Sequence, residues 1–152
     1  MRKSLVLASL IASCAVVFPL PAAADAAPRL ASGADALPRA TDESLRAAME
    51  DLRALVAARL ADGGAEKLNE DEHVTLAAGI DHQVAEIAAG RDFHSPAGRH
   101  LQWMLGDITD GAGLMRSAPR AAGKRLGLLR VVETLNYYGR EYDHPGWAPL
   151  QP

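Results

Sequence analysis

The chain has 152 residues and a formal net charge of −3, and this length suits one domain with its own core. The slightly acidic balance argues against a nucleic-acid partner, which would need a basic face. A single cysteine, Cys14, excludes a disulfide within the chain.

The first residues have the three parts of a secretory signal peptide. A basic start at Arg2 and Lys3 is followed by an apolar run over 5–17 and by small residues at 22–24. We therefore expect a signal peptide over 1–24, a mature chain that begins near Asp25, and a periplasmic location. Removal of Arg2 and Lys3 leaves 14 basic and 19 acidic residues, a net charge of −5.

An alternative is bacterial lipoprotein processing, because the residues over 11–14 read Ile-Ala-Ser-Cys. That processing would leave a lipid anchor on Cys14 and would be the one route to a membrane. The apolar run continues past Cys14 to Phe18, which favours an ordinary signal peptide. Residues 25–40 mix Pro, Gly and Ala without a sustained period, which predicts a flexible N-terminal arm.

Two amphipathic helices are predicted next. Thr41 is expected to cap the first, which ends at Gly63-Gly64. Asn69 and Glu72 have the spacing of a capping box and are expected to begin the second, which ends at Gly90. One apolar stripe runs along each helix: Leu45, Met49, Leu52, Val56 and Leu60 on the first, and Leu76, Ile80, Val84 and Ile87 on the second.

Two further helices follow in the second half of the chain. Ser95-Pro96 is typical of a helix start, and three glycines within that helix, at 106, 111 and 113, indicate either close packing or a bend. The last helix is predicted over 126–143, before Pro145. Their stripes are Leu101, Leu105, Ile108, Ala112 and Met115, and then Leu128, Val131, Leu135, Tyr138 and Tyr142.

Four helices of about 18 to 20 residues would each be about 30 Å long. Short links between them favour antiparallel neighbours, so we predict an all-α fold, an antiparallel up-down-up-down four-helix bundle over 41–147. Residues 148–152 form a C-terminal tail in this prediction.

Two stretches resemble the small periplasmic b-type cytochromes. They are Met-Glu-Asp-Leu over 49–52 and Asn-Tyr-Tyr-Gly-Arg-Glu-Tyr over 136–142. The resemblance implies a four-helix-bundle fold and a role for Met49 as one of two axial haem ligands. The position that matches the family's haem histidine is Gly139 in this chain.

A second resemblance is to small exported bacterial proteins described as DnrO-like. It rests on Ala-Thr-Asp over 40–42, Gly-Ile-Asp over 79–81 and Tyr-Asp-His-Pro-Gly-Trp over 142–147. This resemblance implies an exported helical domain and no particular chemistry.

The sequence has no nucleophile elbow, phosphate loop, haem-attachment motif or His-Glu-x-x-His motif, so we expect no enzymatic activity. The predicted topology places His94, His100 and His144 at one end of the bundle. Three imidazoles there predict a metal site, with copper or zinc as the ion. The plainer interpretation is that these histidines are solvated loop residues.

These patterns predict an exported, non-enzymatic protein that binds a metal ion or a metal-containing cofactor. One alternative is a ligand-free helical adaptor or stress-response protein that binds a protein partner through an exposed helix face with Trp103. Another is a haem protein in which Met49 is one ligand.

Overall fold

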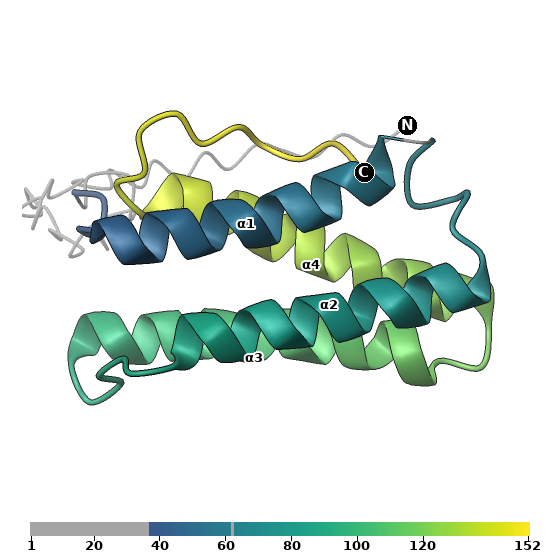
Figure 1. The fold of residues 1–152 in the computed structure, drawn as a ribbon, viewed down its shortest axis with the longest axis horizontal. Helices are drawn as coiled ribbons and strands as arrows, with labels where there is room; N and C mark the ends of the chain where they lie inside the picture. The colour runs from purple at the N-terminus through teal and green to yellow at the C-terminus, as the bar shows by residue number, and fades with distance from the viewer. Residues whose placement is uncertain (1–36, 62) are drawn as a thin grey trace, which may run out of the picture. The chain divides into compact units, whose positions relative to one another are not determined.

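The computed structural model describes residues 37–61 and 63–152. The predicted signal peptide, most of the predicted arm and Cys14 lie outside the described residues. Within them the fold is all-α: four helices pack against one another, and this part of the chain contains no β-strand (Figure 1). None of its helices is both long and apolar enough to cross a membrane.

The helices are α1 (Glu43–Leu60), α2 (Glu70–Ala88), α3 (Pro96–Ser117) and α4 (Ala121–Glu141). The prediction that Thr41 caps the first helix was wrong, because the cap is Asp42, whose carboxylate accepts a hydrogen bond from the Leu45 amide at 2.6 Å. Thr41 instead donates to the backbone oxygen of Asp143.

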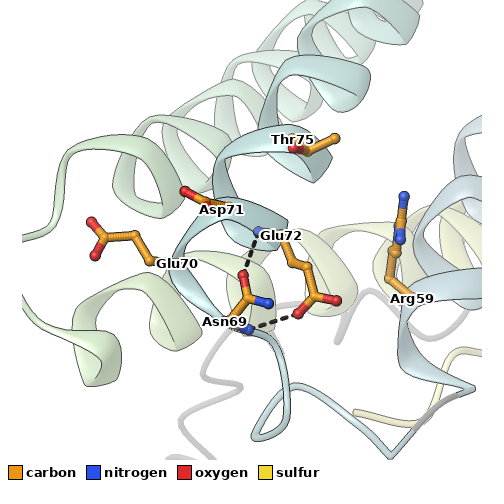
Figure 2. Close-up of a pocket in the computed structure, with 6 residues that line it drawn as sticks. All are labelled: Arg59, Asn69, Glu70, Asp71, Glu72 and Thr75. Carbon is orange, nitrogen blue, oxygen red and sulfur yellow. Dashed lines mark hydrogen bonds between the residues drawn. The ribbon is translucent and has the colours of Figure 1, made fainter.

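The other predicted helix starts had mixed outcomes. The capping box at the start of α2 is confirmed, with Asn69 and Glu72 bonded reciprocally (Figure 2). Ser95 caps α3 through its hydroxyl, as expected. The last helix begins at Ala121, five residues before the predicted start. Residues 121–125 are two alanines, a glycine, a lysine and an arginine, mostly strong helix formers, which explains the longer helix.

The predicted stripes form the core. Every stripe residue is buried except Val84, which is partly buried against the same cluster. Met49 and Tyr138 are among the largest side chains that are fully buried. Truncating a fully buried methionine typically destabilises a protein by about 2–5 kcal/mol, so we expect Met49 to contribute strongly to the stability of the fold.

One of the three glycines predicted to matter in α3 serves close helix packing. A Cβ on Gly111 would lie 2.8 Å from the backbone oxygen of Gly127 in α4, and a Cβ on Gly127 would lie 2.5 Å from the oxygen of Gly111. Gly106 and Gly113 have no such neighbour within 4 Å. The backbones of α3 and α4 therefore approach each other closely at Gly111 and Gly127.

Contacts between helix termini show which ends lie together. Arg91, just after α2, pairs with Asp42 at the start of α1, and the backbone of Arg39 bonds to Glu141 and Asp143 at the end of α4. His100, near the start of α3, bonds to Tyr142. We call this the aromatic end of the bundle; it lies at the start of α1, the end of α2, the start of α3 and the end of α4.

Residues 143–152 include the predicted tail at 148–152; this whole segment, called the tail below, runs back beside α1 and α4 (Figure 1). Asn136 of α4 holds its backbone with two hydrogen bonds to Leu150, at 2.9 and 2.7 Å, and Leu150 is buried. The tail reaches the other end of α1, where Pro152 lies against Gly64. This segment is thus a fifth element packed on the bundle.

Candidate functional site

The candidate functional site combines the aromatic end with a neighbouring groove between α3 and α4. His100 lies in the first turns of α3 and contacts two tyrosines, Tyr137 of α4 and Tyr142, which directly follows α4. Its Nδ1 lies 2.9 Å from the Tyr142 hydroxyl and its Nε2 lies 3.3 Å from the Tyr137 hydroxyl. Burial lowers the pKa of His100, which favours the neutral ring. A neutral imidazole has one accepting and one donating nitrogen, so it accepts from one tyrosine and donates to the other.

A second histidine–tyrosine pair lies beside the first. The hydroxyl of fully buried Tyr138 lies 3.0 Å from Nδ1 of His144 in the tail. Burial raises the pKa of Tyr138 well above its ordinary value and lowers the pKa of His144. Tyr138 stacks on Tyr142, with ring centroids 4.8 Å apart. The two pairs are therefore joined into one cluster of neutral, hydrogen-bonded rings.

Trp147 closes this cluster from the tail. Its ring lies 4.8 Å from Tyr138 and 5.0 Å from His144, centroid to centroid, and the Arg53 guanidinium lies 5.8 Å from its ring. It also lies on Gly139, where an added Cβ would be 2.1 Å from the indole. Trp147 thus occupies the space beside Gly139, the position that matches the haem histidine in the resemblance to b-type cytochromes. Met49, the other residue of that resemblance, is fully buried in the core.

The structure places the three predicted metal ligands at the same end but does not gather them. His94 is exposed on the α2–α3 connection, where its amide donates to Asp92 at 2.8 Å. His100 and His144 each bond to tyrosine hydroxyls. Among the residues that the structure describes, no three His, Cys, Asp or Glu side chains form a group that could hold a metal ion.

A groove of about 190 Å³ lies next to His100, between α3 and α4. At one side Trp103 is 59% exposed, and its ring lies 5.9 Å from His100 and 6.0 Å from Tyr137. Arg140 lies over the Tyr137 ring at 5.7 Å. The lining residues are Trp103, Asp107, Arg130, Glu133, Thr134, Tyr137 and Arg140.

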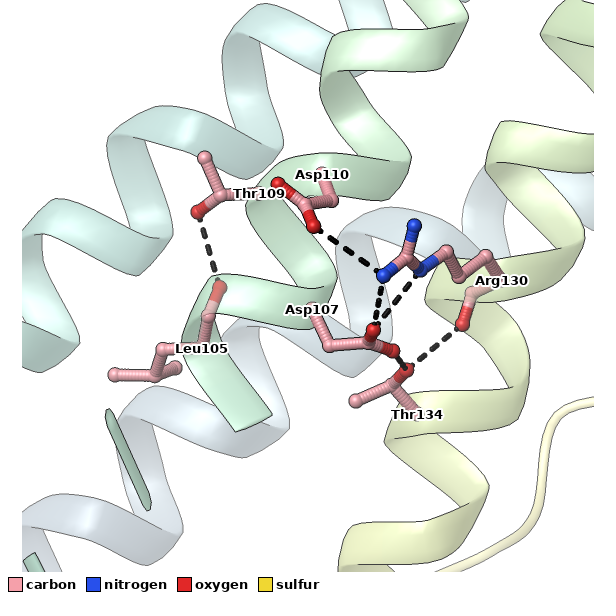
Figure 3. Close-up of polar contacts among 6 residues, drawn as sticks. All are labelled: Leu105, Asp107, Thr109, Asp110, Arg130 and Thr134. Carbon is pink, nitrogen blue, oxygen red and sulfur yellow. Dashed lines mark hydrogen bonds and ion pairs between the residues drawn. The ribbon is translucent and has the colours of Figure 1, made fainter. Parts of the chain in front are cut away.

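The floor of the groove is held by polar contacts between the two helices (Figure 3). Asp107 accepts hydrogen bonds from Arg130 and, at 2.6 Å, from the hydroxyl of Thr134. The bond from Arg130 keeps the pKa of Asp107 below its ordinary value, so the carboxylate stays ionised. Asp110 adds a contact to Arg130 at 3.2 Å. Arg130 thus offsets the charge of Asp107 and contacts Asp110 as well, and these contacts fix the side chains of the floor.

Another hollow lies at the start of α2, and its acidic side chains are explained by the formation of the helix. Its acidic lining, Glu70, Asp71 and Glu72, belongs to the first turn of the helix, and Asn69 and Glu72 are bonded to each other's amides (Figure 2). Acidic residues in the first turn stabilise a helix, because they interact favourably with the positive end of its dipole. We therefore assign these residues to helix initiation.

Sequence reasoning found part of this site. The sequence left exposure and partial burial of Trp103 as alternatives, and the structure shows that this side chain is exposed. His100 was predicted as a metal ligand. The tyrosine partners of His100 and the Asp107–Arg130–Thr134 contacts were missed. Their only signal is that Arg130 and Thr134 lie four residues apart on one face of a helix, which does not identify Asp107 on another helix.

Comparison of the chain with protein-family models, with curated proteins and with solved structures gave no match. The resemblances to b-type cytochromes and to DnrO-like proteins therefore gain no support from these comparisons, and the residues of the site are the basis for any functional inference.

Proposed function

We propose that this chain is an exported, non-enzymatic adaptor, an antiparallel up-down-up-down four-helix bundle that binds a polypeptide segment of a partner protein in the α3–α4 groove. The observation that carries the proposal is the exposure of Trp103 beside a groove whose polar floor is already organised. A large exposed aromatic side chain next to fixed polar groups is typical of an interaction site.

Metal and haem binding, the other predicted functions, have less geometric support. A metal ion at the aromatic end would have to replace the tyrosine partners of His100 and His144. Haem ligation by Met49 would require rearrangement of a core residue, and a group beside Gly139 would displace Trp147. Binding at Trp103 requires neither change.

The charges around the groove favour a particular kind of segment. Arg130 and Asp107 neutralise each other. Glu133 and Arg140, both exposed, remain for a partner, because neither forms an ion pair within the part of the chain that the structure describes. Seven residues separate them on α4, about 10 Å along the axis. A complementary segment has a basic residue near Glu133, an acidic residue near Arg140 and an apolar side chain between them that contacts Trp103.

Selection from a displayed library of random short peptides tests the proposal. We expect the selected peptides to share the basic–apolar–acidic order and to change the fluorescence of Trp103. The W103A variant should bind them about 30-fold more weakly, the effect of losing an interface hot spot of about 2 kcal/mol. L126A is the matched control, because Leu126 is 61% exposed on α4 and lies outside the groove.

Charge reversal provides the second arm of this experiment. The E133K variant should prefer peptides in which the basic residue is replaced by an acidic one. Selected peptides that bind W103A as well as the unaltered protein would overturn the proposal, as would a selection that enriches no peptide.

A further inference from the structure

The tail covers a seam that two helices leave open. α1 packs on α2 and α4 packs on α3, whereas the backbones of α1 and α4 make little direct contact. Trp147 of the tail bridges them, because its ring lies beside Arg53 of α1 and on Gly139 of α4. Trp147 and Leu150 both pack against the core cluster. The core is thus closed at the α1–α4 seam by a non-helical segment (Figure 1).

The α1–α4 seam holds the tail in the way that a groove holds a peptide. The Asn136 side chain accepts a hydrogen bond from the Leu150 amide at 2.7 Å and donates one to the Leu150 carbonyl oxygen at 2.9 Å. Both bonds go to the main chain, so they do not depend on the side chain at that position. The buried Leu150 side chain and the indole on Gly139 supply the selective contacts. Main-chain hydrogen bonds combined with seats for particular side chains are typical of peptide recognition.

The tail is an imperfect occupant of the seam. Nε1 of Trp147 is buried and has no hydrogen-bond partner among the described residues. An unpaired buried donor of this kind weakens the hold of the tail about tenfold, because the indole regains a hydrogen bond with water when the tail leaves. No ion pair in the described part of the chain involves residues 144–152. Four residues of the tail beside its two anchors are exposed: Pro145, Gly146, Ala148 and Pro149.

We propose that the α1–α4 seam binds a segment of a partner protein and that the tail is a built-in competitor for this segment. The segment has an apolar aromatic residue followed three positions later by leucine. Its ring takes the place of the indole on Gly139, and its main chain bonds to Asn136. A ring without an N–H group leaves no donor unpaired, so the segment binds more tightly than the tail. The tail of a second copy would bring the same unpaired indole and would have no such advantage.

Two labelled peptides with the sequence of residues 144–152 are the probes. One keeps the tryptophan, and the other has benzothienylalanine in its place, whose ring has the shape of indole with sulfur instead of the N–H group. The receptor is the W147A variant of the full mature chain, whose own tail lacks the aromatic anchor. Fluorescence anisotropy should show that W147A binds the benzothienyl peptide about tenfold more tightly than the tryptophan peptide. The unaltered protein should bind both peptides more weakly than W147A, because its own tail competes.

Alanine at two glycines locates the binding. In the W147A background, G139A should weaken peptide binding at least about tenfold, because the added Cβ takes up the seat of the ring. G106A, the matched control in α3, should leave binding unchanged. Both changes raise helix propensity, so a loss of binding in G139A does not reflect unfolding. The W103A and W147A double variant should bind as W147A does, because the residues that hold the tail do not line the α3–α4 groove.

A second receptor makes the test independent of one variant. L150A keeps the indole and loses the other anchor, and it should also bind the benzothienyl peptide more tightly than the unaltered protein does. Absence of binding to both receptors, equal affinity for the two peptides, or equal effects of G139A and G106A would overturn the proposal. Dimerisation of the unaltered protein that W147A abolishes would assign the seam to the tail of a second copy and would also overturn it.

Discussion

The contact between Gly139 and Trp147 gives a prediction with an unusual sign. Glycine to alanine in the interior of a helix normally stabilises a protein by about 1 kcal/mol, because alanine has the higher helix propensity. At Gly139 the new Cβ would lie 2.1 Å from the indole of Trp147, so the indole has to move. We therefore expect G139A to destabilise the protein.

The magnitude follows from what Trp147 contacts. Its ring pairs with Tyr138 and His144 are worth about 1 kcal/mol each, and the contact with Arg53 adds about 0.5 kcal/mol. Exposure of the partly buried indole adds about 1 kcal/mol. A loss of about 3.5 kcal/mol against a gain of about 1 kcal/mol leaves a net destabilisation of about 2 to 3 kcal/mol.

Urea unfolding followed by far-UV circular dichroism measures this difference. The matched control is G106A, in the interior of α3, where a new Cβ has no neighbour within 4 Å and should stabilise by about 1 kcal/mol. In a W147A background, G139A should also stabilise by about 1 kcal/mol, since the obstructing ring is gone. Stabilisation by G139A in the unaltered protein would refute the packing of Trp147 on α4.

Three other predictions concern the rest of the bundle. G127A should destabilise the protein by about 2 kcal/mol, because the new Cβ would lie 2.5 Å from the backbone oxygen of Gly111. G113A should not destabilise it, because a Cβ there has no neighbour within 4 Å. Equal melting temperatures of the two variants in thermal unfolding would contradict the close approach of α3 and α4. In the folded state, burial lowers the pKa of His144 below its ordinary value of 6.5, so the unfolded chain takes up the proton more readily. The stabilisation by the neutral His144 ring is therefore complete above pH 6.5 and is lost as the pH falls from 7 to 5. In urea unfolding at pH 7 and at pH 5, the free energy of unfolding of H144N should change less between the two pH values than that of the unaltered protein. An equal change in both proteins would count against a buried neutral ring at His144. D107N should destabilise the protein by about 1 kcal/mol, because it weakens the contacts of residue 107 with α4. D110N should destabilise it by less than about 0.5 kcal/mol, because the Asp110 carboxylate is more exposed. Chemical unfolding of both variants measures these differences.

The helices were predictable because each one is specified locally. The stripe from Leu128 to Tyr142 repeats with the period of an α-helix, and a stripe that must be buried predicts both the helix and its core face. Asn69 and Glu72 lie three residues apart, so their capping box is readable from spacing alone. The cap at Asp42 was missed because Thr41 and Asp42 are adjacent and both residue types are good caps.

The site was less predictable because its contacts join residues that are distant in the sequence. Thirty-seven positions separate His100 from Tyr137 and 27 separate Asp107 from Thr134. Helical periodicity assigns each of these residues to a face of its own helix. It gives neither the relative rotation nor the axial position of two helices, which decide whether two faces meet.

Trp147 shows how this uncertainty affects a functional inference. A methionine on the first helix and aromatic residues on the last one look like parts of a cofactor site when the space between them is assumed to be available. In this fold the tail returns beside α1 and α4, and the indole lies on the helix at Gly139, the position where the resemblance would require a histidine. The glycine at position 139 is therefore explained by the packing of Trp147 on α4. Among the residues that the structure describes, Trp103 is the large aromatic side chain that is exposed to solvent, and it borders the α3–α4 groove and not the end of the bundle where the tail packs.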